Sequence, residues 1–263
     1  MPEGRKELQL LLKVLDDLKE FLPYLVLVGG WVPYLYVRYL WKGIQHEPLT
    51  TVDIDFGFKN GKYSGGETIA DRVRKKHYGE HHVSIDRDIP FIPVVRLEKG
   101  DLRADVEFIT APETSERVRV NLIGWEIKIN EIENFGILLE SPIGLGVEGR
   151  QIDVPQPSIF IFHKLLTFTQ RENRDKQQKD LYYAYYLLFF SPEREKLVEE
   201  LSQHIANSKQ GERVKQNILT YFEDPNAKGP TLIMEGAGGT AIRTFVPNIR
   251  QDAYERILAL VRG

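Results

Sequence analysis

Hydrophobic residues recur at steps of three and four near the start of the chain, at Leu8, Leu11, Leu12, Leu15 and Leu18. This spacing predicts an amphipathic helix that Pro23 ends. The apolar run at residues 24–28 predicts a short strand, and Gly29 with Gly30 predicts a tight turn after it. Residues 31–41 then follow as a second helix, because a proline is tolerated in a first helical turn.

Strand-length patterns dominate the middle of the chain. Residues 51–58 form an apolar run that predicts a strand, and residues 69–77 predict a helix with several cations on its exposed side. Further strands are predicted at residues 83–85, 91–97 and 102–109, with a hairpin turn at 98–101. Residues 117–139 are predicted to form more short strands.

From Ser158 onward the hydrophobic period becomes helical. Helices are predicted from Ser158 to about Thr167, over 181–190, from Pro192 and over 248–262, whereas the glycine- and proline-rich residues 225–246 are predicted to be a loop. The Pro155-Gln156-Pro157 segment marks a change of domain, into residues 1–154 and a helical subdomain of residues 155–263. Strands in the first part and helices in the second indicate an α+β fold.

Composition narrows the protein class. The 263 residues are 42% hydrophobic and 28% charged, which is typical of a globular protein, and no apolar run is long enough to cross a membrane. Because no signal-peptide pattern opens the chain, we expect a cytoplasmic protein. The absence of cysteine excludes disulfides, thiolate metal sites and cysteine nucleophiles. A net charge of −3 gives no overall case for nucleic-acid binding, which would need a local basic surface.

Two aspartates stand at alternate positions of the predicted strand 51–58. Asp53 and Asp55 would therefore point to one face. Ionised groups inside an apolar strand are disfavoured unless they are paired, hydrated or bound to metal. Mg²⁺ commonly uses one or two carboxylates together with phosphate oxygens, so this pair favours a metal site open to a nucleotide. The competing interpretation is an edge strand with one solvated face.

A second metal position requires a third carboxylate. Asp105 and Glu107 share one face of the predicted strand 102–109, and Arg103 on that face is close enough to pair with either acid. We choose Asp105 as the third ligand and keep Glu107 as the alternative. A salt-bridged surface strand without metal is the competing interpretation.

Gly29 and Gly30 precede a helix. A residue without a Cβ atom lets backbone N–H groups approach an anion closely, and a helix start favours phosphate. The two glycines are therefore candidates to bind a triphosphate, although a plain strand-to-helix turn explains them as well.

A basic stretch lies in the helical part. Between Lys164 and Asp180 five cations outnumber three acids. Lys164 stands among apolar neighbours, where a cation needs an anionic partner, and Arg171 follows seven residues later on the same face of a helix. Both are candidates to bind phosphate. For Arg171 and the cations after it, a solvated charged face with pairs such as Lys176 and Asp180 is an equal alternative.

These motifs resemble a known family. Gly29 and Gly30, the Asp53-Ile54-Asp55 pair and Asp105 look like the glycines and three carboxylates of the DNA polymerase β-like nucleotidyltransferase superfamily. The later residues Lys164, Arg171 and Lys179-Asp180-Leu181 are more similar to abortive-infection type nucleotidyltransferase toxins.

The resemblance implies a mixed sheet flanked by helices, Mg²⁺ or Mn²⁺, and a nucleoside triphosphate donor. It also implies catalytic roles for Lys164 and Asp180, RNA or tRNA as an acceptor, and an antitoxin protein as a partner.

The expected activity is transfer of a nucleoside monophosphate to a hydroxyl group. Asp53, Asp55 and Asp105 would hold metal, and Asp105 would also help the acceptor lose its proton. Lys164 would stabilise phosphate charge, and Asp180 would orient Lys164 or the acceptor. The alternatives are a catalytically inactive nucleotide- or partner-binding protein on the same fold, and an enzyme that modifies a small molecule such as an antibiotic.

Overall fold

The computed structural model describes residues 4–44, 46–49, 51–59, 63–81, 94–99, 102–114, 116–124, 127, 129–240 and 242–262. The chain divides into two compact units, which are treated separately below. Unit 1 comprises residues 1–35 and 50–155, and unit 2 comprises residues 36–49 and 156–263. The division after Pro155 lies at the predicted change of domain, but unit 2 also takes in residues 36–49.

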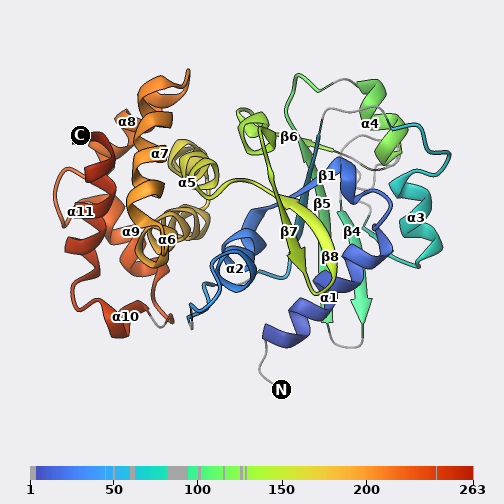
Figure 1. The fold of residues 1–263 in the computed structure, drawn as a ribbon, viewed down its shortest axis with the longest axis horizontal. Coiled ribbons are helices and arrows are strands. Elements are labelled where there is room, and N and C mark those ends of the chain that lie inside the picture. Colours follow the sequence, from blue (N-terminus) through green and yellow to red (C-terminus); the bar gives the residue numbers. More distant parts are fainter. Residues whose placement is uncertain are drawn as a thin grey trace. The chain divides into compact units, whose positions relative to one another are not determined.

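Unit 1 is built on a mixed sheet in the order β1-β2-β5-β4-β3, with β6 beside β5. Figure 1 labels β1, β4, β5 and β6 of this sheet. The strands are β1 (Leu25–Val28), β2 (Ile54–Phe58), β3 (Gly79–His81), β4 (Val94–Lys99), β5 (Leu102–Thr110) and β6 (Asn130–Glu131). The β2–β5 and β5–β6 pairs are parallel, and the other pairs are antiparallel. The predicted α+β class with a mixed sheet is confirmed. The predicted strand at residues 83–85 lies outside the described residues.

Helices flank this sheet. Helix α1 (Gly4–Asp17) packs on β4 and β5 through leucines that are fully buried, and α3 (Ile69–Lys75) packs against α4 (Glu116–Ile123). The short segments are η1 (Leu22–Tyr24), η2 (Gly29–Trp31), α2 (Val32–Leu35) and η4 (Phe135–Leu139). A hairpin of β7 (Ile143–Val147) and β8 (Arg150–Val154) adds a two-stranded sheet, which contacts β1 through β8.

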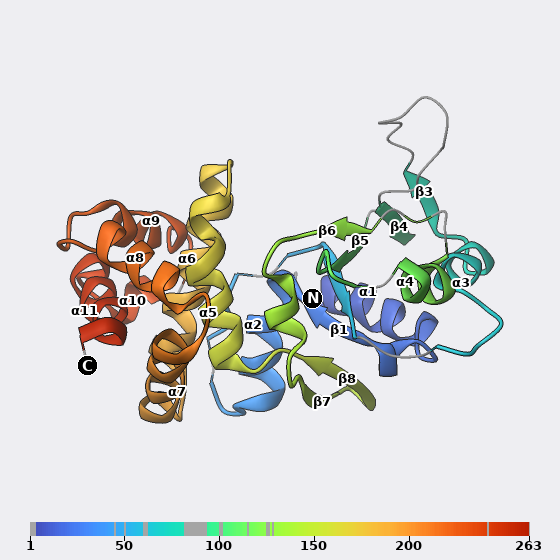
Figure 2. The same ribbon diagram turned by 90° about the horizontal axis from the view of Figure 1, so that it is seen from above.

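Unit 2 is helical, apart from the loop that ends at Leu49 (Figure 2). It contains η3 (Tyr36–Leu40), α5 (Pro157–Thr167), η5 (Phe168–Gln170), α6 (Arg174–Phe190), α7 (Arg194–Asn207), α8 (Gly211–Tyr221), α9 (Lys228–Gly236), α10 (Ile242–Phe245) and α11 (Ile249–Arg262). Helix α5 contacts α6, α7 and α8, and its residues from Ser158 to Thr167 are all buried. Most of α5 is apolar, which suits the interior of a bundle, and its buried polar residues are Ser158, His163, Lys164 and Thr167.

Helix α6 carries four buried tyrosines, and three of their hydroxyls bond to other segments of unit 2. Tyr183 donates to the carbonyl of Leu49 at 3.0 Å, and Tyr186 donates to the carbonyl of His46. Tyr185 donates to Asp252 of α11 at 2.6 Å. The bonds to Leu49 and His46 tie residues 36–49 to α6 within unit 2.

The predictions of secondary structure for residues 117–139 and 225–246 are wrong in part. Residues 116–123 form helix α4 instead of a strand, since packing against α3 outweighs the strand propensity of their alternating valines. Residues 228–236 and 242–245 form helices α9 and α10 instead of a loop. Gly229 and Gly236 pack too closely against their neighbours to carry a side chain. A Cβ atom on Gly229 would lie 2.5 Å from the ring of Phe222, and one on Gly236 would lie 2.9 Å from the carbonyl oxygen of Gln178.

None of the helices in the described part of the chain combines the length and the hydrophobicity needed to cross a bilayer.

Candidate active site

The glycine turn lies directly against one of the predicted aspartates. Strand β1 ends at Val28, which pairs with Asp55 of β2. Gly29 follows with φ of +73°, and a Cβ atom on it would lie 1.9 Å from Oδ2 of Asp55. Only glycine fits here, because both the backbone conformation and the neighbouring carboxylate exclude a side chain. The turn therefore packs its backbone against the carboxylate of Asp55. The predicted binding of a triphosphate by Gly29 and Gly30 stays a prediction.

The two aspartates differ in their surroundings. Asp55 is half-buried in β2, whereas Asp53 is exposed and precedes the strand, which begins at Ile54 and not at residue 51. The backbone N–H of Asp53 donates to Oγ1 of Thr51 at 3.3 Å. Asp53 therefore lies on the loop that enters β2, where it is open to solvent.

Strand β5 brings two more carboxylates beside β2. In the parallel register Glu107 stands opposite Asp55. Asp105 stands opposite Arg96 of β4, and the guanidinium holds its carboxylate at two points, with Nε–Oδ1 at 2.6 Å and Nη2–Oδ2 at 2.9 Å. Glu107 accepts a hydrogen bond of 3.2 Å from the amide of Asn130. The cation that neutralises Asp105 is thus Arg96, and not the exposed Arg103.

The carboxylates have the chemistry of a magnesium site. Oxygen ligands from one or two carboxylates suffice for Mg²⁺ when phosphate and water complete its shell. Asp53 and Asp55 fit this role. Among the described residues no three acidic or histidine side chains are close enough together to form a complete metal site. The suggested third ligand, Asp105, is already engaged by Arg96.

In unit 2 the predicted residues Lys164, Arg171 and Asp180 meet. Asp180 of α6 accepts from Nζ of Lys164 at 2.5 Å and from Nε of Arg171 at 2.9 Å. Helix α5 ends at Thr167, so Arg171 does not share a helical face with Lys164. The two cations are joined by Asp180 instead, and the suggested pairing of Asp180 with Lys176 is replaced by these contacts.

This cluster is buried and carries a net positive charge. Only 9% of the Lys164 side chain and 7% of Asp180 are exposed, against 32% of Arg171. Burial raises the pKa of the Asp180 carboxyl, but the charges of Lys164 and Arg171 outweigh it, so the pKa lies below its usual value. One carboxylate therefore holds two cations in place.

His163, next to Lys164, is a buried residue that sequence reasoning did not single out. Burial, with the charge of Lys164 adding to it, lowers the pKa of His163 to about 3. The ring is therefore neutral at physiological pH. Its position on the apolar helix α5 was visible in the sequence, but its burial was not.

Arg96 was also missed, although the hairpin could have revealed it. The register places Lys99 opposite Leu102, which leaves a Gly-Asp pair between the two strands. Two-residue hairpin loops commonly contain glycine and aspartate. With that turn assumed, counting back along both strands sets Arg96 opposite Asp105.

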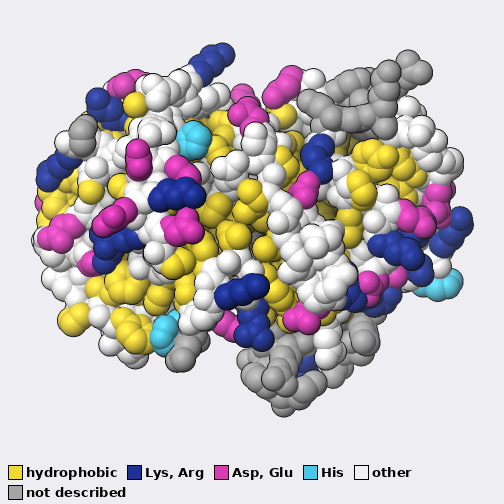
Figure 3. All heavy atoms as spheres, in the orientation of Figure 1, with side chains coloured by type: hydrophobic (Ala, Val, Ile, Leu, Met, Phe, Trp, Pro, Cys, Tyr) yellow, Lys and Arg dark blue, Asp and Glu magenta, His cyan; other side chains and the backbone are white. Residues whose placement is uncertain are grey.

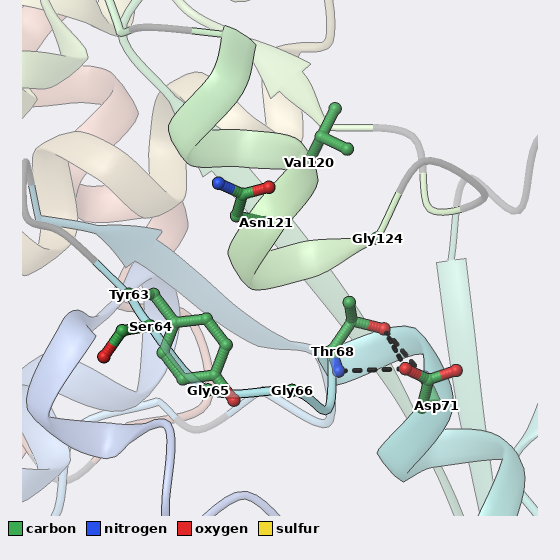
Figure 4. Close-up of a pocket in the computed structure, with 9 residues that line it drawn as sticks. All are labelled: Tyr63, Ser64, Gly65, Gly66, Thr68, Asp71, Val120, Asn121 and Gly124. Carbon is green, nitrogen blue, oxygen red and sulfur yellow. Dashed lines mark hydrogen bonds between the residues drawn. The ribbon is translucent and has the colours of Figure 1, made fainter.

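Unit 1 also contains an open cavity of about 600 Å³ (Figure 4). Thr68 and Asp71 face each other at its edge, where they form the N-terminal cap of α3. The cavity is lined by Tyr63, Ser64, Gly65, Gly66, Thr68, Asp71, Val120, Asn121 and Gly124. Its described lining includes no lysine or arginine and carries the carboxylate of Asp71, so the cavity is poorly suited to a triphosphate.

Comparison with known proteins decides the family. A family model described as nucleotidyltransferase matches residues 7–207. The chain belongs to this nucleotidyltransferase family. The matched segment contains every predicted site residue from Gly29 to Asp180, and helices α8 to α11 lie beyond it.

No curated protein matches the sequence. One solved structure that is similar to this nucleotidyltransferase family member is that of an antigenic nucleotidyltransferase-like protein from Paracoccidioides brasiliensis. The two sequences are 12% identical and the TM-score is 0.41, over 81% of this chain and 88% of that chain.

Proposed function

We propose that this protein transfers a nucleoside monophosphate from a nucleoside triphosphate to a hydroxyl group of an RNA, with Mg²⁺ or Mn²⁺ as cofactor. The observation that carries the proposal is the contact between the glycine turn and Asp55. A turn that must be glycine lies against a carboxylate, and a second carboxylate, Glu107, stands opposite on the next strand. Because the chain belongs to the nucleotidyltransferase family, we assign nucleotidyl transfer to this arrangement.

The reaction forms one bond and breaks another. The acceptor hydroxyl oxygen attacks the α-phosphorus, and an oxygen–phosphorus bond forms. The bond from the α-phosphorus to the bridging oxygen breaks, and pyrophosphate leaves with the electron pair. The hydroxyl proton passes to a carboxylate of β5, for which Asp105 is our choice and Glu107 is the alternative.

Other residues of unit 1 would bind the cation and the phosphate. Asp53 and Asp55 would hold the cation together with one carboxylate of β5, either Asp105, which Arg96 already engages, or Glu107, which stands opposite Asp55. The backbone of Gly29 and Gly30 would bind phosphate. When bound, the divalent cation neutralises charge on the triphosphate and on the departing pyrophosphate.

In unit 2, Lys164 and Arg171 supply positive charge toward phosphate, and Asp180 positions both cations. This role is supported by the pairing of all three residues within unit 2.

The RNA acceptor is supported by the resemblance of the Lys164 to Leu181 region to abortive-infection type toxins. On the same basis we propose that the protein is cytoplasmic and acts as the toxin of a toxin–antitoxin pair, with tRNA among the candidate acceptors. The antitoxin would be a protein partner.

The test is transfer of label from each α-labelled nucleoside triphosphate into total RNA and into a small-molecule extract, with Mg²⁺ or Mn²⁺. We expect label in RNA with the wild type and with Glu195→Gln, an exposed change on α7. Asp53→Ala and Asp55→Ala should abolish transfer while their unfolding temperatures stay near the wild-type value. Turnover by both aspartate variants would refute the two-carboxylate mechanism.

Two further variants separate the β5 carboxylates. Asp105→Asn and Glu107→Gln each remove one charge with almost no change of shape. The variant that loses transfer while keeping triphosphate binding identifies the group that takes the proton. Label found only in the small-molecule extract would mean that the acceptor is a small molecule and not RNA. Metal-dependent triphosphate binding with no transfer at all would indicate an inactive binding protein.

A further inference from the structure

A cavity of about 680 Å³ in unit 2 carries two arginines and no acidic residue. It lies outside the segment that the nucleotidyltransferase family model matches. Its lining comes from the segments around α9, α10 and α11, and includes Asn226, Met234, Arg243, Asn248 and Arg250. We call it the arginine cavity. Its lining charge of +2 contrasts with the negative charge of the whole chain.

Neutral groups hold both guanidinium groups. Arg243 donates from Nη2 to the carbonyl of Met234 at 3.0 Å. Arg250 donates from Nε to the sulfur of Met234 at 3.2 Å and from Nη1 to Oδ1 of Asn226 at 3.2 Å. No carboxylate in the part of the chain that the structure describes forms an ion pair with either arginine. Both charges are therefore oriented but not neutralised, which favours an anionic ligand.

The start of α11 adds to this preference. Ile249, Arg250 and Gln251 line the cavity and form the first turn of this 14-residue helix. The side chain of Asn248 accepts a hydrogen bond of 3.2 Å from the backbone N–H of Gln251. The N-terminal end of a helix attracts negative charge, which reinforces the effect of the two arginines.

An exposed aromatic side chain lies outside the lining but close to it along the chain, two residues after Arg243 and directly before Val246, which both line the cavity. Phe245 belongs to the same short helix as Arg243, and 48% of its surface is exposed. Its ring centroid lies 4.3 Å from that of His46 and 6.4 Å from that of Phe190. In Figure 3 hydrophobic side chains and a histidine reach the surface where Figure 1 places α10. Such a ring offers a face on which a nucleic-acid base can stack.

We infer that the arginine cavity and Phe245 together form a docking site for single-stranded RNA. Arg243 and Arg250 contact phosphates of the strand, and Phe245, supported by His46, stacks on a base. A strand of several nucleotides can reach both the arginines of the cavity and a ring two residues away along the chain, and single-stranded nucleic acid combines phosphate contacts with base stacking. A free phosphate has no base to stack, and the bases of duplex RNA are already stacked. The inference rests on the proposed function, because it locates where the acceptor RNA is held.

The experiment measures binding of a fluorescein-labelled single-stranded RNA of mixed sequence by fluorescence anisotropy, across a series of salt concentrations. Arg243→Gln and Arg250→Gln should each reduce the salt slope by about 0.7, the value for one phosphate contact on a single strand. The double variant should reduce it by about 1.4. Arg194→Gln, at an exposed arginine of α7, is the matched control and should leave the slope unchanged.

The aromatic contact has its own test. Phe245→Ala should weaken RNA binding by about fivefold or more with an unchanged salt slope, because base stacking does not depend on counterions. Phe245→Trp should restore binding. Duplex RNA and inorganic phosphate should be insensitive to both changes. An unchanged slope in both arginine variants, or equal losses for duplex and single strand, would overturn the inference.

The test of the RNA docking site can fail or succeed independently of the test of nucleotidyl transfer. Asp53→Ala should bind the RNA as the wild type does. If the wild type labels RNA while the arginine variants bind it normally, the docking site fails and the nucleotidyltransferase function stands. If the arginine variants lose RNA binding while no protein transfers label, the docking site stands and the proposed reaction fails.

Discussion

Replacing Gly29 by alanine tests the contact on which the proposed site depends. Gly29 has φ of +73°, and its Cβ position lies 1.9 Å from the carboxylate oxygen of Asp55. Alanine therefore meets two separate penalties, one from its own backbone and one from its neighbour. The second penalty falls on a residue that we assign to metal binding.

The size of each penalty follows from the geometry. An L-residue in the left-handed region costs about 1 to 2 kcal/mol. Real Cβ atoms essentially never come within 3.0 Å of such an atom, so the Asp55 carboxylate has to move by about 1 Å. A displacement of that size at a reacting centre costs on the order of 100-fold in rate. We expect Gly29→Ala to fold with reduced stability and to lose about 100-fold in transfer activity.

Gly149→Ala is the matched control. Gly149 has φ of +80°, and a Cβ atom on it would have nothing within 4 Å. It carries the backbone penalty alone and should transfer label at the wild-type rate. Thermal unfolding followed by circular dichroism measures the stability cost, and incorporation of an α-labelled triphosphate measures the activity. Wild-type transfer by Gly29→Ala, or an equal loss in Gly149→Ala, would refute the argument.

Two predictions concern the buried charges of unit 2. Asp180→Ala leaves Lys164 and Arg171 without their carboxylate, and should cost about 3 to 5 kcal/mol in urea unfolding. The double change Asp180→Leu with Lys164→Met should recover much of this cost. No recovery would contradict the view that the cost arises from a buried cation left without its carboxylate. His163 has a folded pKa of about 3, below its unfolded value of about 6.5. The unfolded chain therefore binds the proton first, and stability should fall as the pH drops from about 6.5 toward 3, by at most about 1.4 kcal/mol per pH unit. His163→Gln should flatten that part of a urea-midpoint profile, and an unchanged profile would rule out His163 as its cause.

The parts of the fold that sequence predicted best have strong local signals. The strand before Gly29, the segment that became β5 and the closing helix α11 all appear close to their predicted bounds. Each combines a clear hydrophobic period with a turn residue or proline at its edge. In contrast, α9 contains glycine and proline and was expected to be a loop. Its glycines serve close packing between helices, which no local pattern reveals.

The same contrast applies to the site. Gly29 and Asp55 were predicted to belong to one site, and in the structure a Cβ atom on Gly29 would lie 1.9 Å from the carboxylate of Asp55. Lys164 and Arg171 were assigned to one helical face, but they meet only because Asp180 reaches both from α6. Contacts between residues distant in sequence depend on tertiary packing, so the partners of each charged group could not be counted from spacing alone.

The carboxylates of β5 show why register matters for function. Asp105 and Glu107 share a face of the strand, and the sequence does not say which neighbour each one meets. The register sets Asp105 opposite a cation, Arg96, and sets Glu107 opposite another acid, Asp55. Like charges directly opposite on neighbouring strands are destabilising, and local conflicts of this kind are expected at functional sites. A divalent cation would relieve the repulsion between Asp55 and Glu107, whereas Arg96 already balances Asp105. On this argument Glu107→Gln should weaken metal-dependent triphosphate binding more than Asp105→Asn does.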